Sequence, residues 1–141
     1  MELCERHHND NEHSFFVAEL SREIFLRTEA IHGLDRRWLP ALEAGAQLHN
    51  LGLFYGARRH HVRGMELILE RGVAGFSPEE IALIALCARF HRKRVRAEEA
   101  LLYRALPAEL QKVALRLAAI VRVADGAGLL PRSIGAAELL R

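Results

Sequence analysis

Apolar residues recur along this chain at the three- and four-residue intervals of α-helices, and few segments alternate apolar with polar positions. The first helical face comprises His13, Val17, Leu20 and Ile24. It predicts a helix that follows the "NDNEH" segment, whose Asn and Asp residues can cap it, and that runs to about Ile31 before Gly33. A second helix is predicted after "GLD", with an end near Gly52. Its shared face carries Leu42, Ala46 and His49.

Two further helices follow in the middle of the chain. One is predicted from near Arg59 to Gly72. Its inward residues are expected to be Met65, Ile68 and Leu69. The "FSPEE" segment begins the next helix, with Ser77 as N-cap, Pro78 at the first helical position and Glu80 completing a capping box. The buried stripe of that helix is predicted to comprise Ile81, Ile84, Ala88 and His91.

The last third of the chain is also helical in pattern. Residues 97–105 favour a short helix, and residues 107–126 form the most apolar helix, ended by Gly126 and Gly128. Ala and Leu are abundant, whereas aromatic residues make up 6% of the chain. These features predict an all-α fold, a compact bundle of five to six helices, within a single domain that spans residues 1–141.

Composition narrows the possible binding partners of the protein and its possible location in the cell. Hydrophobic residues make up 50% of the chain, which is typical of a folded globule, and the formal net charge of +2 is too small to indicate nucleic acid or a membrane as partner. No apolar stretch reaches the ~18 residues that a membrane span needs. Cys4 and Cys87 match no metal-binding spacing, and Cys87 lies in an apolar run expected in the core. Without a disulfide framework or a signal peptide, a cytoplasmic location is expected.

Histidine is the residue type that points to chemistry. Eight histidines occur in the chain, and several fall on the apolar faces of different predicted helices, together with one aspartate in the most apolar helix. These inward candidates are His13, His49, His60 or His61, His91 and Asp125. Burying one unpaired polar group costs ~1–3 kcal/mol, so several are tolerated when they satisfy one another or share a dication. Imidazoles and a carboxylate that project inward from different helices suit a first-row metal ion.

Each candidate also has a purely structural explanation. A single inward histidine is more often a hydrogen-bonded core residue than a metal ligand. Asp125 has an alternative partner in Arg122, one turn earlier on the helix surface. His7, His8 and His32 are expected at the surface or in loops.

Two segments carry a family resemblance. "ALEAGAQLHNLG" resembles the "AALLHDIG" segment of HD-superfamily phosphohydrolases. Over roughly residues 12–128, and most specifically in "GFSPEEIALIAL" followed by "ARFHRK", the chain is similar to the C-terminal helical domain of the exopolyphosphatase / guanosine pentaphosphate phosphatase family. The resemblance implies an HD-domain-like fold with a phosphohydrolase-type pocket. It does not imply exopolyphosphatase activity, because in that family hydrolysis resides in separate actin-like α/β domains, whose glycine-rich phosphate loops these 141 residues lack.

The resemblance also implies a ligand set, with two departures. Carried over by position, the HD pattern places metal ligands at His13, His49, Asn50 and Asp125. His60 and His61 match a family "HHKH" cluster in which Arg63 here replaces a histidine. Asn50 stands where the pattern has an aspartate, and its neutral carbonyl oxygen binds a cation more weakly than a carboxylate does. These departures favour a degenerate centre over a two-metal one, with a single weakly held divalent ion (Mn, Fe, Ni, Zn or Mg) as the alternative.

Basic residues bunch near the same predicted helix ends. The candidates for binding phosphate are Arg58, Arg59, Arg63, Arg92 and Lys93. Charge-assisted hydrogen bonds from such side chains suit phosphate oxygens, whereas the alternative is a solvated helix end whose cations complement the helix macrodipole.

Three functions stay open at this point. The first is a metal-dependent phosphohydrolase of HD type that acts on a phosphorylated small molecule. The second is a non-catalytic module that binds polyphosphate or a nucleotide, or that forms a homodimer. The third is a helical bundle whose histidines are satisfied within its core. The first two require the imidazoles and Asp125 to converge in space.

Overall fold

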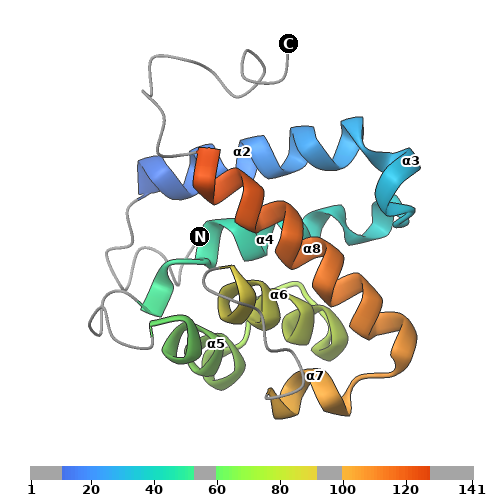
Figure 1. Cartoon of the computed structure of the whole chain (residues 1–141). Coiled ribbons are helices and arrows are strands. Elements are labelled where there is room, and N and C mark those ends of the chain that lie inside the picture. The colour runs from blue at the N-terminus through green and yellow to red at the C-terminus, as the bar shows by residue number, and fades with distance from the viewer. Residues whose placement is uncertain (1–10, 53–59, 92–99, 128–141) are drawn as a thin grey trace.

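The computed structural model describes residues 11–52, 60–91 and 100–127, and its helices form one bundle (Figure 1). The five longer helices are α2 (Asn11–Arg27), α4 (Leu39–Leu48), α5 (His60–Arg71), α6 (Pro78–Phe90) and α8 (Ala108–Ala127). The short elements are α3 (Glu29–His32), the 3₁₀-helix η1 (Arg36–Trp38) and α7 (Leu101–Ala105). No strand occurs in these three stretches, so the all-α prediction is confirmed. None of their helices has both the length and the apolar run to cross a membrane.

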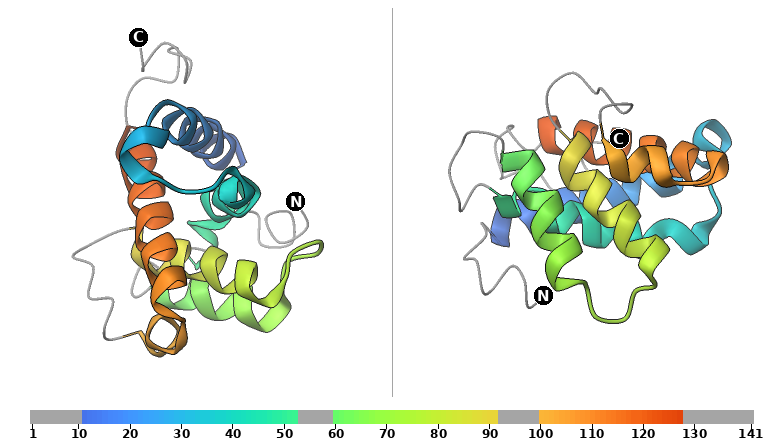
Figure 2. Two further views of the ribbon diagram at one scale, coloured as in Figure 1. Left: turned by 90° about the vertical axis from the view of Figure 1, so that its right-hand side faces the viewer. Right: turned by 90° about the horizontal axis from the view of Figure 1, so that it is seen from below.

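The central helices are α4 and α6, and the others pack around them. In Figure 1, α8 crosses the front of the bundle, where it packs against both α2 and α6. Helix α2 packs against α4, and α5 lies antiparallel beside α6, as the view from below in Figure 2 shows. This arrangement brings helices from both ends of the sequence onto the same two central elements.

Two apolar clusters hold the bundle together. The larger joins α2, α4, α6 and α8, and its largest fully buried side chains include Phe25, Leu42, Leu86, Phe90 and Leu117. The smaller joins α4, α5 and α6, and it includes Leu48, Leu51, Leu67, Ile68 and Ile84. The prediction of an inward Leu69 is wrong, because that side chain is 42% exposed while Leu67 is fully buried. The buried face of α5 is therefore rotated toward Leu67 from the one that the sequence pattern indicated.

Two glycines let the central helices approach closely. A Cβ atom on Gly45 of α4 would lie 2.8 Å from the Cβ of Cys87 on α6, which confirms Cys87 as a core residue. A Cβ on Gly64 of α5 would lie 3.3 Å from the backbone nitrogen of Gly52 and 3.6 Å from the Cβ of Ala88. The end of α4, the beginning of α5 and the end of α6 are thereby brought together.

The helix ends agree with the sequence in part. The capping box of α6 is present, since Ser77 Oγ accepts from the Glu80 N–H at 3.2 Å and the Glu80 carboxylate accepts from the Ser77 N–H at 3.1 Å. The first predicted helix is instead interrupted at Thr28, and α3 follows before Gly33 closes it in the left-handed conformation. Helix α4 ends at Leu48, several residues earlier than predicted.

Candidate metal centre

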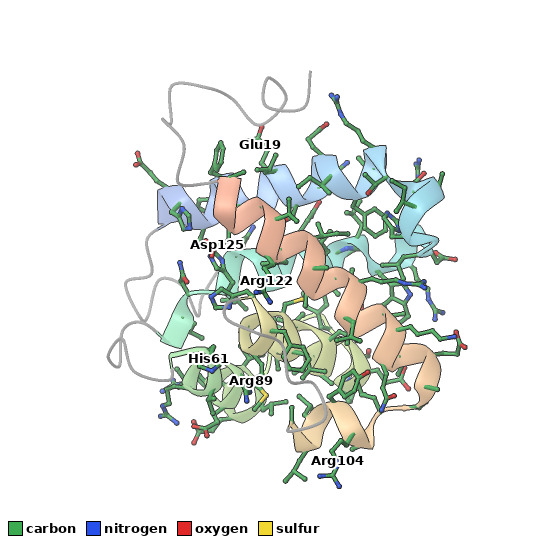
Figure 3. The ribbon with its side chains drawn as sticks, viewed as in Figure 1. Glu19, His61, Arg89, Arg104, Arg122 and Asp125 are labelled. Atoms are coloured by element: carbon green, nitrogen blue, oxygen red, sulfur yellow. The ribbon has the colours of Figure 1, made fainter. Side chains whose placement is uncertain are left out.

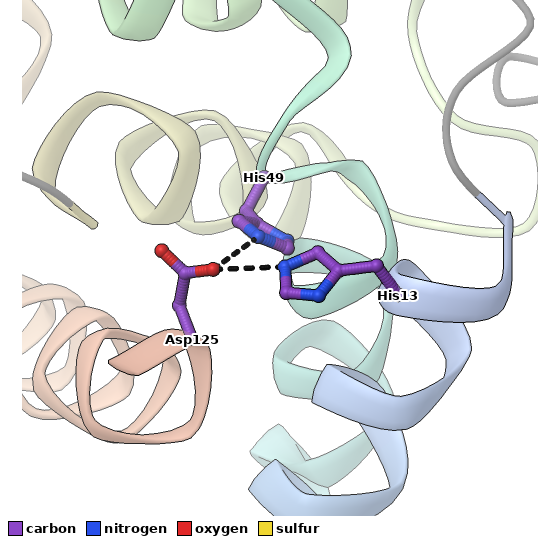
Figure 4. Close-up of side chains that lie close together, drawn as sticks. All are labelled: His13, His49 and Asp125. Carbon is purple, nitrogen blue, oxygen red and sulfur yellow. Dashed lines mark hydrogen bonds and ion pairs between the residues drawn. The ribbon is translucent and has the colours of Figure 1, made fainter. Parts of the chain in front are cut away.

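Three of the residues singled out from the sequence meet in the interior of the bundle (Figure 4). His13 lies in the first turn of α2, His49 directly follows α4, and Asp125 lies in the last turn of α8. One ligand atom from each of them lies within 4.8 Å of the other two. His49 is fully buried, and the side chain of Asp125 is only 7% exposed. The convergence on which the functional hypotheses depend is therefore present for these three residues.

Both imidazoles point at the same carboxylate oxygen. Oδ1 of Asp125 lies 3.0 Å from Nε2 of His13 and 3.1 Å from Nε2 of His49 (Figure 4). Asp125 thus lies in the interior beside two imidazoles, whereas Arg122, the alternative partner, is exposed. One oxygen with two ring nitrogens around it is an arrangement that a shared proton or a cation satisfies.

The orientation of the His49 ring is fixed by the helix that precedes it. Nδ1 of His49 donates to the backbone carbonyl of Ala46, one turn earlier. Because a carbonyl only accepts, Nδ1 carries a proton, and Nε2 is the ring nitrogen that faces Asp125. Nε2 donates to the carboxylate when it carries a proton, and it can bind a cation through its lone pair when it does not. Metal-binding histidines commonly show this pattern, in which the second ring nitrogen donates to a backbone carbonyl. The site therefore fits a dication, which Nε2 of His49 and the carboxylate of Asp125 would hold.

His91, which directly follows α6, lies next to His49 at the side of the centre. Its Nδ1 donates to the carbonyl of Ala88 at 2.7 Å, and its ring centroid lies 5.0 Å from that of His49. The close set of ligand atoms found among the described residues does not include His91. Both His49 and His91 close an A-x-x-H sequence at a helix end, a repeated spacing that could have revealed their shared orientation from the sequence.

The charge state of the centre follows from these contacts. Burial alone would raise the pKa of Asp125, but hydrogen bonds and charge interactions with His49, followed by His13, outweigh it and hold the pKa well below its usual range. A further contribution in the same direction comes from His91. Asp125 is therefore an ionised carboxylate in the interior, which is the form that binds a metal ion.

Of the remaining residues that the sequence predicted for the site, the structure describes only some. Asn50 is buried, and its Oδ1 accepts no hydrogen bond within the described part of the chain. His61 lies on α5 outside the close set of ligand atoms, and Arg63 pairs with Glu66 at 3.2 Å on the surface of the same helix. The side chain of His60 and the four other predicted phosphate-binding residues lie outside the described residues. These are Arg58, Arg59, Arg92 and Lys93.

The expectation that His32 is a surface or loop residue is wrong. His32 is 7% exposed, its Nε2 donates to the carbonyl of Phe25 at 2.8 Å, and its Nδ1 accepts from the Leu34 N–H at 2.9 Å. The ring also packs on Phe25, with centroids 4.3 Å apart. Because the chain reverses between Thr28 and Gly33, this histidine folds back onto the end of α2 rather than into solvent.

The fold and the site together define a class of protein: an all-α domain in which two imidazoles and one carboxylate, from three helices, converge on a buried point. The family model "Ppx/GppA phosphatase, domain III" matches residues 1–127. The chain therefore belongs to the Ppx/GppA phosphatase family, and it corresponds to domain III of that family. Among curated proteins, none matches this chain.

Proposed function

We propose that this exopolyphosphatase-related domain is of HD type, that it holds one divalent metal ion through His13, His49 and Asp125, and that it binds a phosphorylated ligand there. The observation that carries the proposal is the group of three ligand atoms within 4.8 Å, two nitrogens and one anionic oxygen. Mixed nitrogen and oxygen ligands suit first-row ions such as Mn, Fe, Ni and Zn better than Mg, which prefers oxygen ligands. A bound ion would supply Lewis-acid chemistry by polarising a phosphoryl oxygen.

Whether this centre only binds a phosphorylated ligand or also hydrolyses it efficiently depends on Asn50. A buried amide oxygen without a hydrogen-bond partner among the described residues supports a neutral fourth ligand at this position. A neutral ligand leaves the site one negative charge short of the HD pattern, so a second ion is disfavoured. We therefore assign binding of a phosphorylated small molecule or polyphosphate, rather than efficient hydrolysis, as the function of the chain.

Metal titration of the purified protein tests the proposal. Wild-type protein should bind about one equivalent of Mn²⁺ or Zn²⁺, and Asp125→Asn should weaken that binding at least ~100-fold, because the only anionic ligand is lost. Glu109→Gln is the matched control, since Glu109 lies on the same helix with its side chain 87% exposed. Equal affinities in the two variants, or no binding by the wild type, would remove the proposal.

A second variant tests the assignment of Asn50. Asn50→Asp restores the carboxylate of the HD pattern and should raise the metal affinity about tenfold or more. It should also raise the rate at which a generic phosphate ester is hydrolysed in the presence of the metal. If neither quantity changes, Asn50 lies outside the centre, and the reading of this chain as a weakened phosphohydrolase is wrong.

A further inference from the structure

Arg122 has no side-chain ion pair or hydrogen bond with any described residue, and it lies on the same helix as Asp125 of the candidate centre. Most arginines in the described part of the chain make an ion pair or hydrogen bond, as Arg22 does with Glu43 at 2.9 Å and Arg63 with Glu66 at 3.2 Å. Arg122 is exposed and makes neither with any described residue. It lies on α8 three residues before Asp125. A guanidinium that no described residue neutralises, one turn from Asp125, is available to a ligand.

The geometry of α8 directs Arg122 toward the centre. Two positions three residues apart are separated by about 60° around a helix axis and by about 4.5 Å along it. Figure 3 shows Arg122 and Asp125 on the flank of α8 that faces α6, and these two helices pack together. His91, which lies at the side of the centre, follows the last residue of α6. Arg122 is therefore an exposed residue on the same flank of α8 as the buried Asp125, one turn away from it.

We propose that Arg122 forms an oxyanion subsite, in which its guanidinium binds a phosphate group of the ligand at the centre. This inference rests on the proposed function and adds a residue that the sequence pattern had not assigned to phosphate. A guanidinium presents two parallel N–H groups that match two phosphate oxygens, and such charge-assisted pairs are the strong ones. Within the described part of the chain, Arg122 has no ion pair that must break before the anion binds.

The usual structural reason for a cation near a helix end does not account for Arg122. Lysine and arginine stabilise the last turn of a helix by interaction with the macrodipole. The last turn of α8 contains no basic residue, because the helix continues to Ala127. Arg122 lies before this turn, so interaction with the macrodipole does not explain its position.

Phosphate binding by matched variants tests the subsite. The variants are Arg122→Gln and Arg104→Gln. Arg104 is also exposed and its side chain has no partner among the described residues, but it lies on α7 at the far end of the bundle (Figure 3). Inorganic phosphate is titrated into Mn²⁺-loaded protein, and phosphorus NMR relaxation reports its binding. We expect Arg122→Gln to weaken phosphate binding roughly 10- to 100-fold, and Arg104→Gln to leave it within about twofold of wild type. Arg122→Lys keeps the charge but not the paired N–H groups, so its loss should be intermediate.

The outcomes separate this inference from the proposed function. Normal Mn²⁺ binding with equal phosphate affinity in Arg122→Gln and Arg104→Gln overturns the subsite and leaves the metal centre intact. If the wild type binds no metal, the metal centre fails, and the same phosphate titration is read on the metal-free protein. There, selective loss in Arg122→Gln supports the subsite, whereas equal affinities, or no phosphate binding by the wild type, overturn it. A weaker Mn²⁺ affinity in Arg122→Gln would also contradict the subsite, because loss of a positive charge near the centre should leave cation binding unchanged or strengthen it.

Discussion

His32 and His49 are both buried histidines close to the end of a helix, and their surroundings differ in one respect. The two ring nitrogens of His32 are both engaged by the backbone, since one donates to the carbonyl of Phe25 and the other accepts from the Leu34 N–H. His49 donates to a backbone carbonyl through Nδ1, but its Nε2 lies 3.1 Å from a carboxylate oxygen. Both ring nitrogens of a neutral His32 have a hydrogen-bond partner. Nε2 of His49, by contrast, needs a proton or a cation between it and the carboxylate of Asp125.

The comparison shows that burial alone does not distinguish a metal ligand from a core residue. What distinguishes them is the partner of the second nitrogen: an N–H donor at His32 and a carboxylate acceptor at His49. A neutral imidazole accepts at only one nitrogen, so His32 has no lone pair left for a metal ion. The same substitution at the two positions should therefore give different phenotypes.

The largest effect is expected on metal binding at His49. His49→Gln removes an imidazole ligand and should weaken Mn²⁺ or Zn²⁺ binding about 100-fold or more, equivalent to about 2.7 kcal/mol. Isothermal titration measures it, with His32→Gln as the control that should stay within about twofold of wild type. Equal losses in both variants would mean that the metal responds to general loosening of the fold and not to the ligand set.

The second effect is a loss of stability, and it is expected when His32 is replaced. His32→Gln breaks the bridge from the Phe25 carbonyl to the Leu34 N–H and leaves buried backbone groups without a partner. The free energy of unfolding should fall by about 1–3 kcal/mol, as measured by urea denaturation of metal-free protein. An unchanged midpoint with an unchanged slope would show that water replaces the ring at no cost, and the structural role assigned to His32 would be wrong.

These two histidines also mark what the sequence could and could not predict. His13, His49 and Asp125 were found because each lies on an apolar helical face, a property of the local sequence that survives into the packed bundle. The location of His32 was predicted wrongly because its partners are backbone groups that the turn at Thr28 brings close to it. The spacing of side chains along the sequence does not predict such a turn. The capping box at Ser77 was predictable for the opposite reason, since all of its contacts are local.

The rotation of a helix about its axis was the other feature that the sequence did not predict. Leu69 and Leu67 are both apolar and only two residues apart, so periodicity did not decide which of them faces α6. The choice depends on the close contact of Gly64 with Gly52 and Ala88, which involves three different segments. The sequence therefore predicted the existence and order of the helices better than the rotation of each about its axis.

The third effect tests whether close helix contact positions His49. Gly45 lies one turn before His49 on α4, and a methyl group there would press against Cys87, 2.8 Å away. Gly45→Ala should lower the free energy of unfolding by about 1–3 kcal/mol and displace His49 from Asp125, so metal affinity falls as well. Gly126→Ala is the control, because no atom lies within 4 Å of the added methyl, and it should stabilise α8 by up to about 1 kcal/mol. Destabilisation by both variants would point to backbone conformation instead of contact.

Cys87 is a third buried titratable group, and among the described residues it has neither the backbone partners of His32 nor the carboxylate of His49. Burial raises the pKa of the Cys87 thiol to about 12. The thiol therefore stays neutral in the folded protein, and its contribution to stability is complete below pH ~8.5 and is lost as the pH rises toward 12. At pH ~8, iodoacetamide should modify Cys87 at least roughly 1000-fold more slowly in native protein than in urea, as followed by mass spectrometry of its peptide. Rapid labelling of the native protein would place Cys87 at a surface that opens between α4 and α6, and the close packing that holds His49 in position would then be transient.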